Sequence, residues 1–389
     1  MMSVTHLIDI AMVATLASFV ASMLIVLTQG WHGRLSLDGD VTSIQKFHKR
    51  PVPRIGGLAV AIGVFSAFLF GAATEPRALQ GDSAGDVFRL LLAGMPAFLA
   101  GLTEDLTKRV SVRVRLTATL ASAVLAYWLL GAYLPRIDVW GLDALFAVLP
   151  LAILITSVAV AGVANSINII DGFHGVAGSA VVILLAGLGV LAWQAGDAFV
   201  ARLALLGIGA TIGFLLVNYP TGRLFMGDGG AYLMGFWVAE VAVLLVLRNP
   251  SINAWQVLAV CAYPIIEVMY SIYRRIVIRK VSPGAPDRLH LHTLVYRRLV
   301  CQLIPRNDGK PWIRNAAVAL VLAAWMALAA MAGIKFGDSV ASAVTVVILE
   351  ALAYMAVYTR LIRGRWQMRP RFSLEIRPGP VVRLSRRKW

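Results

Sequence analysis

About eleven apolar runs, each roughly 17–22 residues long, constrain the fold of this chain more than any other feature of its sequence. An α-helix needs about 20 apolar residues to cross the hydrocarbon core of a bilayer. Only 14% of the 389 residues are charged, whereas an ordinary soluble domain carries about 25%. The sequence therefore predicts an all-α, polytopic integral membrane protein. The expected spans are residues 7–28, 55–73, 88–103, 116–134, 145–165, 175–193, 199–217, 231–247, 254–273, 315–334 and 337–358.

The positive charges predict how these spans are oriented. Of the 36 Lys and Arg residues, 30 fall in alternate connecting segments and in the tail. Because Lys and Arg accumulate on the cytoplasmic side, we expect the N-terminus outside and the C-terminus in the cytoplasm. The net charge of +16 then reflects topology, and no nucleic-acid partner is expected. The inner segments are residues 29–54, 104–115, 166–174, 218–230 and 274–314, with a basic tail, 359–389, that suits anionic lipid headgroups.

The third inner segment follows the span 145–165 and is unusually polar for a membrane boundary. Asn165, Asn168, Asp171 and His174 recur every three residues, so they would form one polar stripe if the helix continued. Such groups are costly near lipid unless they are partnered, which favours a functional site. Helix capping beside a glycine packing face is the alternative.

Acidic residues mark two further inner segments. Glu104 and Asp105 precede Lys108, a pattern that could orient a hydrated Mg²⁺ or accept a proton. The alternative is a helix end with compensating charges. Asp228 is flanked by glycines directly before a span, where free backbone N–H groups bind anions and a carboxylate suits Mg²⁺. A glycine turn whose Asp caps the next helix is the alternative.

The first and last inner segments are basic and carry histidines. Lys46 lies in a basic stretch that suits phosphate, although lipid headgroups would attract it equally. Arg288, His290 and His292 fit a diphosphate or a sugar better than a metal, with a solvated loop helix as the alternative. Glu267 lies deep within a span, where we favour a neutral, hydrogen-bonded carboxyl over a proton site.

Taken in order, these segments resemble the polyprenyl-phosphate N-acetylhexosamine-1-phosphate transferases, a family related to the phospho-N-acetylmuramoyl-pentapeptide transferase. The resemblance runs from about Lys46 to Arg298. Its motifs are His48-x(4)-Pro53-x-x-Gly56-Gly57, Glu104-Asp105-x-x-Lys108, Asn165-x-x-Asn168-x-x-Asp171-Gly172-x-x-Gly175, Phe225-x-x-Asp228 and His290-x-His292.

The resemblance implies a single transmembrane catalytic domain, residues 1–358, in the bacterial inner membrane with its site on the cytoplasmic face. Such an enzyme moves a hexosamine 1-phosphate from a UDP-N-acetylhexosamine to a polyprenyl (undecaprenyl) phosphate and releases UMP. The product would begin a cell-surface polysaccharide such as O-antigen or capsule. By resemblance, Asp228 and Asn168 would hold Mg²⁺, with Mn²⁺ as an alternative ion, and Asp105, Glu104 and Asp171 would be catalytic. The implied substrate-binding residues are Lys46, His48, Lys108, Asn165, His174, Asn218, Arg288, His290 and His292.

Three positions depart from the family pattern. Glu104 replaces an Asp, His174 replaces the second Asp of its motif, and Thr293 replaces a third His. The last two bear on the donor, so UDP-N-acetylglucosamine is not assumed and peptidoglycan synthesis is less favoured. A single in-line displacement is the preferred mechanism, with Asp105 orienting the acceptor or taking its last proton; a phospho-enzyme on Asp105 is the alternative. A secondary transporter, or an inactive relative that acts as a scaffold, are the rival functions, and a homodimer stays open.

Overall fold

The computed structural model describes residues 4–38, 51–74, 84–282, 287–305, 307, 309–310 and 312–364. Within this part of the chain ten helices are long and apolar enough to cross a membrane, and a bent pair would make an eleventh. The predicted all-α membrane fold is therefore confirmed. The ten helices are α1 (Val4–Leu27), α3 (Gly56–Thr74), α4 (Ala84–Thr107), α5 (Val112–Leu130), α6 (Leu149–Ile170), α7 (Val176–Gln194), α8 (Ala198–Asn218), α9 (Gly227–Arg248), α14 (Trp312–Phe336) and α15 (Val340–Ile362).

The ninth expected span, 254–273, is not one straight helix. It consists of α10 (Ala254–Val260) and α11 (Ala262–Tyr273), and the pair that continues to residue 278 is bent by 84°. Pro264 lies in the first turn of α11, where its missing N–H is tolerated. In a continuous helix its ring would clash with the carbonyl of Val260, the last residue of α10. The apolar run predicted the span, whereas the bend depends on this proline.

Short elements connect the long helices. Two strands, β1 (Leu37–Asp38) and β2 (Val52–Pro53), form an antiparallel pair in the first connection. The remaining elements are α2 (Gln29–Ser36), the 3₁₀ turn η2 (Asp143–Ala147), the π-helical turns η3 (Arg274–Ile278) and η4 (Tyr296–Val300), α12 (Leu291–Val295) and α13 (Cys301–Leu303).

Helix α9 forms the centre of the bundle. It packs against α3, α4, α6, α7 and α8, whereas α15 lies at the edge, with most of its surface exposed. Two glycines allow neighbours to approach the start of α9. A Cβ on Gly57 would lie 2.2 Å from the backbone N of Gly230, and one on Gly101 would lie 2.6 Å from the carbonyl carbon of Asp228. Side chains at either position would push α3 or α4 away from α9.

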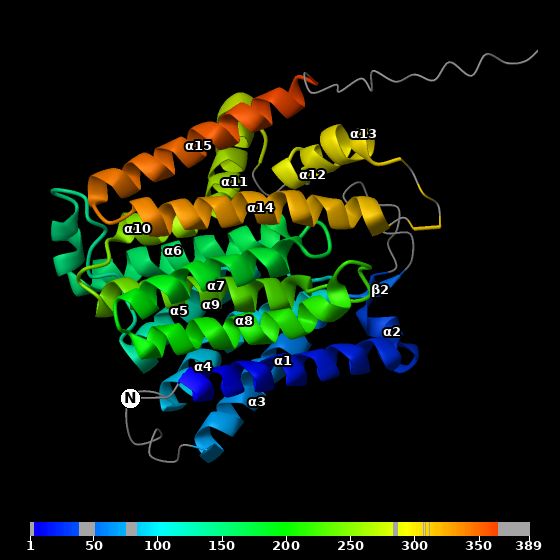
Figure 1. Cartoon of the computed structure of the whole chain (residues 1–389), viewed down its shortest axis with the longest axis horizontal. Coiled ribbons are helices and arrows are strands. Elements are labelled where there is room, and N and C mark those ends of the chain that lie inside the picture. Colours follow the sequence, from blue (N-terminus) through cyan, green and yellow to red (C-terminus); the bar gives the residue numbers. More distant parts are fainter. Residues whose placement is uncertain are drawn as a thin grey trace, which may run out of the picture.

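The expected inner connections lie at one end of the bundle. Figure 1 shows α2, β2, α12 and α13 at the end opposite the N-terminal end of α1. Several connections are shorter than expected because the helices continue into them: α4 includes residues 104–107, α6 includes 166–170, and α9 begins at Gly227. The tail boundary expected at 359 likewise lies inside α15, and residues 365–389 fall outside the described part of the chain. The motif residues are therefore carried largely by helix ends, which hold side chains more rigidly than loops.

Candidate active site

Asp228, in the first turn of α9, is the centre of a polar cluster. Its Oδ1 lies 3.4 Å from Arg54 Nη2 and accepts a hydrogen bond from Asn168 Nδ2 at 3.2 Å. Its Oδ2 forms an ion pair with Arg115 of α5. The Arg115 guanidinium also lies 5.9 Å from the ring centroid of Tyr232, a cation–π contact. Three separate segments thus converge on the Asp228 carboxylate of α9.

Asp105, near the end of α4, holds the start of α9 in place. Its Oδ1 and Oδ2 accept hydrogen bonds from the backbone N–H groups of Asp228 and Gly229, both at 2.9 Å. Arg54 Nη2 lies 3.5 Å from Oδ1 of the same carboxylate. A carboxylate at a helix N-terminus satisfies unpaired N–H groups and interacts favourably with the helix dipole. Asp105 therefore fixes the position of Asp228.

The polar stripe expected from Asn165 to His174 does not form, because α6 ends at Ile170. Asn168 reaches Asp228, and Asn165 Oδ1 accepts a hydrogen bond from Tyr232 at 3.2 Å. Asp171 follows the helix and is half-buried. Its burial raises the pKa of its carboxyl to about 7, although the nearby Arg54 guanidinium opposes the shift. Asp171 is thus suited to exchange a proton near neutral pH.

His174 turns away from the Asp228 cluster. It is buried beside Gly222, where an added Cβ would lie 2.7 Å from His174 Nδ1. Burial lowers the pKa of the imidazole to about 4, and hydrogen bonding to the carbonyls of Trp312 and Pro220 opposes this shift. Asn218 connects two backbone segments: its Oδ1 accepts a hydrogen bond from the backbone N–H of Gly175 at 2.7 Å. These two predicted substrate ligands therefore join the 171–175 and 218–224 connections.

The Glu104–Lys108 segment forms the turn after α4. Glu104 Oε2 accepts a hydrogen bond from the backbone N–H of Val110 at 2.7 Å, so the side chain that departs from the family pattern closes this turn. Lys108 is exposed and has a φ of 56°, the left-handed conformation that ends many helices. The predicted phosphate contact of Lys108 stays a prediction.

The two histidines of the last motif stack on each other. The rings of His290 and His292 are parallel within 4°, with centroids 5.4 Å apart. His292 lies over Gly172, where a Cβ would be 2.6 Å from its Nε2, and its ring meets that of Phe173 edge to face. Burial, followed by the charge of His290, lowers the pKa of His292 to about 4, so this ring is neutral at pH 7. The histidine segment thus contacts the connection that carries Asp171.

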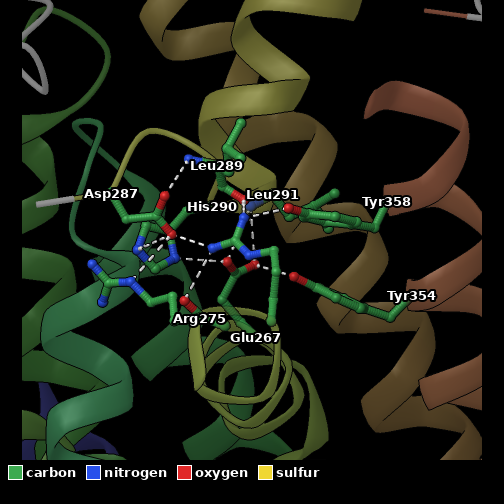
Figure 2. A network of polar contacts seen from close by, with 10 residues as sticks. Glu267, Arg275, Asp287, Leu289, His290, Leu291, Tyr354 and Tyr358 are labelled. Atoms are coloured by element: carbon green, nitrogen blue, oxygen red, sulfur yellow. Dashed lines mark hydrogen bonds and ion pairs between the residues drawn. The ribbon is translucent and has the colours of Figure 1, made fainter. Parts of the chain in front are cut away.

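Glu267 of α11 supports His290 from below (Figure 2). Its Oε1 lies 3.0 Å from His290 Nδ1, and the carboxylate accepts from the backbone N–H of Leu291 and from the Tyr354 hydroxyl. These donors suit an ionised carboxylate, which only accepts hydrogen bonds. The hydrogen-bonded environment expected for Glu267 is confirmed, whereas the neutral form that the sequence favoured does not fit these partners.

The other predicted ligands lie apart from these contacts. Arg288 is exposed on the loop before His290, while Arg274 makes the ion pair with Asp287. Lys46 and His48 lie outside the described residues. Their predicted roles remain predictions.

Sequence reasoning named Arg54 among the basic residues that suit phosphate, but it gave no role to Arg115 or Arg274. Arg54 and Arg115 contact Asp228, and Arg274 contacts Asp287. Arg115 and Arg274 were counted only among the positive charges that set topology, because an arginine beside a span has the same sequence signature in either role. The only signal for Arg115 was its position close to a recognised motif.

The donor atoms around Asp228 fit a hard divalent cation. Asp228 offers a carboxylate, and Asn168 offers its amide carbonyl once its N–H group faces Asp228. Mg²⁺ takes oxygen ligands and is commonly bound by one or two protein groups, with substrate phosphates completing its shell. Within the described residues no group of three His, Cys, Asp or Glu side chains could hold a metal. The site therefore fits a metal shared with a substrate better than a protein-only metal centre.

Comparison with known proteins finds a similar family. Residues 87–246 match the model of glycosyl transferase family 4. Over these residues the chain is similar to that family. The matched region contains Asp105, Asn168, Asp171 and Asp228, the residues that the structure brings together or near Arg54. The resemblance inferred from the motifs is thus confirmed.

The chain is also similar to curated proteins over about two thirds of its length. The probable undecaprenyl-phosphate N-acetylglucosaminyl 1-phosphate transferase of Bacillus subtilis (strain 168) is 28% identical over 255 residues, 65% of this chain and 68% of the relative. The undecaprenyl-phosphate alpha-N-acetylglucosaminyl 1-phosphate transferase of Yersinia pestis is 29% identical over 266 residues, 66% of this chain and 69% of the relative. The Escherichia coli (strain K12) protein with the same description is 27% identical over 266 residues. Together with the apolar helices, these similarities support a multi-pass membrane protein.

Proposed function

We propose that this protein transfers a hexosamine 1-phosphate from a UDP-sugar to undecaprenyl phosphate and releases UMP. The observation that carries the proposal is the convergence of Arg54, Arg115 and Asn168 on Asp228 at one end of a membrane bundle. The curated relatives are described as transferases of this kind. Both substrates are polyanions, so a site that binds them together needs fixed positive charge beside a carboxylate that can hold a cation.

The chemistry depends chiefly on charge and positioning. The acceptor phosphate is already an anion near neutral pH, and it attacks the β-phosphorus of the donor. Arg54 and Arg115 would neutralise phosphate charge, while Asp105 keeps Asp228 and the α9 N-terminus in position. Asp228 and Asn168 would hold Mg²⁺, which when bound supplies charge neutralisation at the diphosphate.

Asp171 is the better candidate for a proton acceptor. Asp105 uses both oxygens to accept backbone N–H groups, which opposes its sequence-based role as the group that takes the acceptor's proton. Asp171 also lies near the Arg54 guanidinium. We assign it the last proton of the acceptor phosphate, and we keep the direct, single displacement.

We place the reaction on the cytoplasmic face of the bacterial inner membrane. The labelled elements of the inner segments, α2, β2, α12 and α13, lie at one end of the bundle (Figure 1), and most Lys and Arg residues belong to the inner segments and the tail. The product would begin a cell-surface polysaccharide such as O-antigen or capsule. Because His174 packs beneath the 218–224 connection, its departure from the family pattern concerns loop structure as much as donor choice.

A panel assay tests this function. The protein, purified in detergent, is incubated with undecaprenyl phosphate, Mg²⁺ and each of several UDP-N-acetylhexosamines, and UMP and the mass of the lipid product are measured. One donor should give UMP and a lipid heavier by a hexosamine phosphate. Asp228→Asn should lower turnover by at least about 100-fold, whereas Asp86→Asn, which removes an exposed ion pair with Arg89, should not.

Two outcomes would contradict the proposal. If no donor yields UMP, the protein is not this transferase; if Asp228→Asn keeps wild-type turnover, Asp228 is not the metal ligand. The inactive-scaffold alternative predicts that Glu104→Asp restores activity to a silent wild type. Glu104 closes its turn through a hydrogen bond to Val110, so we expect the shorter Asp to lower activity.

A further inference from the structure

Glu267 is a buried carboxylate whose partners come from two other parts of the chain, residues 290–291 and Tyr354. The residue is 1% exposed on α11. His290 Nδ1 lies 3.0 Å from Oε1, the Leu291 N–H lies 3.0 and 3.3 Å from the two oxygens, and the Tyr354 hydroxyl donates to Oε2 at 3.0 Å. Because a backbone N–H and a hydroxyl already donate to Glu267, His290 completes the set as a third donor. The contact therefore fixes the proton of His290 on Nδ1.

The other nitrogen of His290 faces a second carboxylate. Its Nε2 lies 3.8 Å from Asp287 Oδ2. Arg274 bonds the same Asp287 carboxylate and the hydroxyl of Tyr358, and it donates to the carbonyl of Leu289 at 2.9 Å. Arg275 Nε lies 3.9 Å from Asp287. Figure 2 shows Asp287 and Arg275 close to His290, with Tyr354 and Tyr358 on the other side of Glu267.

The His290 ring positions His292, and His292 contacts the segment that carries Asp171. The two rings stack in parallel, and His292 rests on Gly172, directly after Asp171. Within the described residues, Nδ1 of His292 is buried and has no hydrogen-bond partner. A buried polar atom of this kind requires an explanation, and a bound ligand is one.

We propose that Glu267 is a positioning residue for the donor: it orients the stacked His290–His292 pair, which forms one wall of the UDP-sugar site. This inference rests on the proposed transferase function. Glu267 acts through His290 and does not touch the substrate. Since Tyr354 bonds the same carboxylate, α15 takes part in holding the wall, although it lies at the edge of the bundle and carries no family motif.

A double-mutant cycle tests this role. Gln places its amide where the histidine Nε2 was and leaves no donor at the place of Nδ1, so the cycle uses Glu267→Gln, His290→Gln and the double variant. Loss of one charged hydrogen bond should raise the KM for the UDP-sugar by about ten-fold in each single variant. The KM for undecaprenyl phosphate should not change, and kcat should change by less than about three-fold. The double variant should be no worse than the worse single variant, because both changes break the same link.

A tyrosine pair provides a milder test that keeps the carboxylate. Tyr354→Phe removes the hydroxyl that donates to Glu267 and should raise the donor KM by about three-fold. Tyr270→Phe is the matched control: its ring lies against that of Tyr354, so ring packing is similar, and the donor KM should stay at the wild-type value. Melting temperatures of all variants in detergent show whether each one folds.

The outcomes separate this inference from the proposed function. A wild-type protein that releases no UMP overturns the function and the inference together. An active wild type overturns the inference alone if Glu267→Gln keeps the wild-type donor KM, or if the single effects multiply in the double variant. Should Glu267→Gln not fold, a wild-type donor KM in Tyr354→Phe overturns the inference.

Discussion

The backbone N–H of Asp228 donates to the carboxylate of Asp105 at 2.9 Å, across 123 residues of chain. The bond connects the end of α4 to the start of α9, and the Gly229 N–H strengthens it. The Asp228 side chain also pairs with Arg54 and Arg115 and accepts a hydrogen bond from Asn168. The position of the Asp228 carboxylate in this cluster therefore depends on Asp105. Asp105 is therefore needed for the geometry of the site whatever else it does in the reaction.

Replacing Asp105 should separate its hydrogen bonds to the α9 N-terminus from its ion pair with Arg54. Asp105→Ala removes both acceptors of the α9 N-terminus and should lower the free energy of unfolding by about 2 kcal/mol, because buried N–H groups lose their partners. Asp105→Asn keeps one acceptor oxygen and should lose less stability, while the ion pair with Arg54 is lost in both. Thermal unfolding in detergent measures the difference. Equal stability of the two variants would show that the hydrogen bonds from the Asp228 and Gly229 N–H groups to Asp105 contribute little to the free energy of unfolding.

Arg115 should compete with a divalent cation for Asp228. Arg115→Gln removes a positive charge that is paired with Asp228, so Mn²⁺, used as a probe, should bind several-fold more tightly. Turnover should fall in the same variant, since phosphate charge is then less well neutralised. Electron paramagnetic resonance of free Mn²⁺ gives the affinity without any assay of turnover. The exposed Arg113 provides the control Arg113→Gln; equal Mn²⁺ affinities in both variants would remove Arg115 from the metal site.

His174 should make the protein less stable in acid. Burial lowers the pKa of His174 to about 4 from an ordinary value of 6.5, so the unfolded chain binds a proton on this ring at higher pH than the folded chain does. The contribution to stability is complete above pH 6.5 and is lost as the pH falls toward 4. Between pH 7.5 and 4.5 the loss should be about 2–3 kcal/mol.

His174→Asn should reduce this acid sensitivity. The amide cannot titrate, so unfolding measured at pH 7.5 and 4.5 should differ less in the variant than in the wild type. His292 has a lowered pKa of about 4 for a similar reason, so part of the acid sensitivity should remain. An identical pH dependence in variant and wild type would contradict the burial of a neutral His174.

The close approach of α3 to α9 should make Gly57 intolerant of a side chain. The Cβ of Gly57→Ala would lie 2.2 Å from the backbone N of Gly230, and backbone cannot move as a side chain can. The variant should lose about 1–3 kcal/mol or more of stability, together with activity, because α9 shifts. Gly71→Ala on the same helix meets only the end of the Ile10 side chain at 3.6 Å and should be neutral or slightly stabilising. Melting temperatures of the two variants decide the matter.

The sequence determined the architecture and predicted three of the polar residues that the structure brings together, Asp105, Asn168 and Asp228. Apolar runs of membrane-spanning length predicted every long helix, because a bilayer requires a fixed length of continuous apolar helix. The motif spacing placed Asn168 and Asp228 in one site, and the structure joins them by a hydrogen bond. The hydropathy pattern did not predict the bend after Val260, because the mean hydropathy of a run does not show where a proline breaks a helix.

Only the tertiary structure decided which residues share a contact and what each contact does. Asn165, Asn168, Asp171 and His174 have one spacing, yet the end of α6 at Ile170 sends His174 to a different set of partners. Arg115 and Glu267 carry no family motif, and their roles appear only because distant helices bring Asp228 and His290 within hydrogen-bonding range. Spacing along a chain defines neighbours within one helix, whereas contacts between helices depend on the packing of the whole bundle.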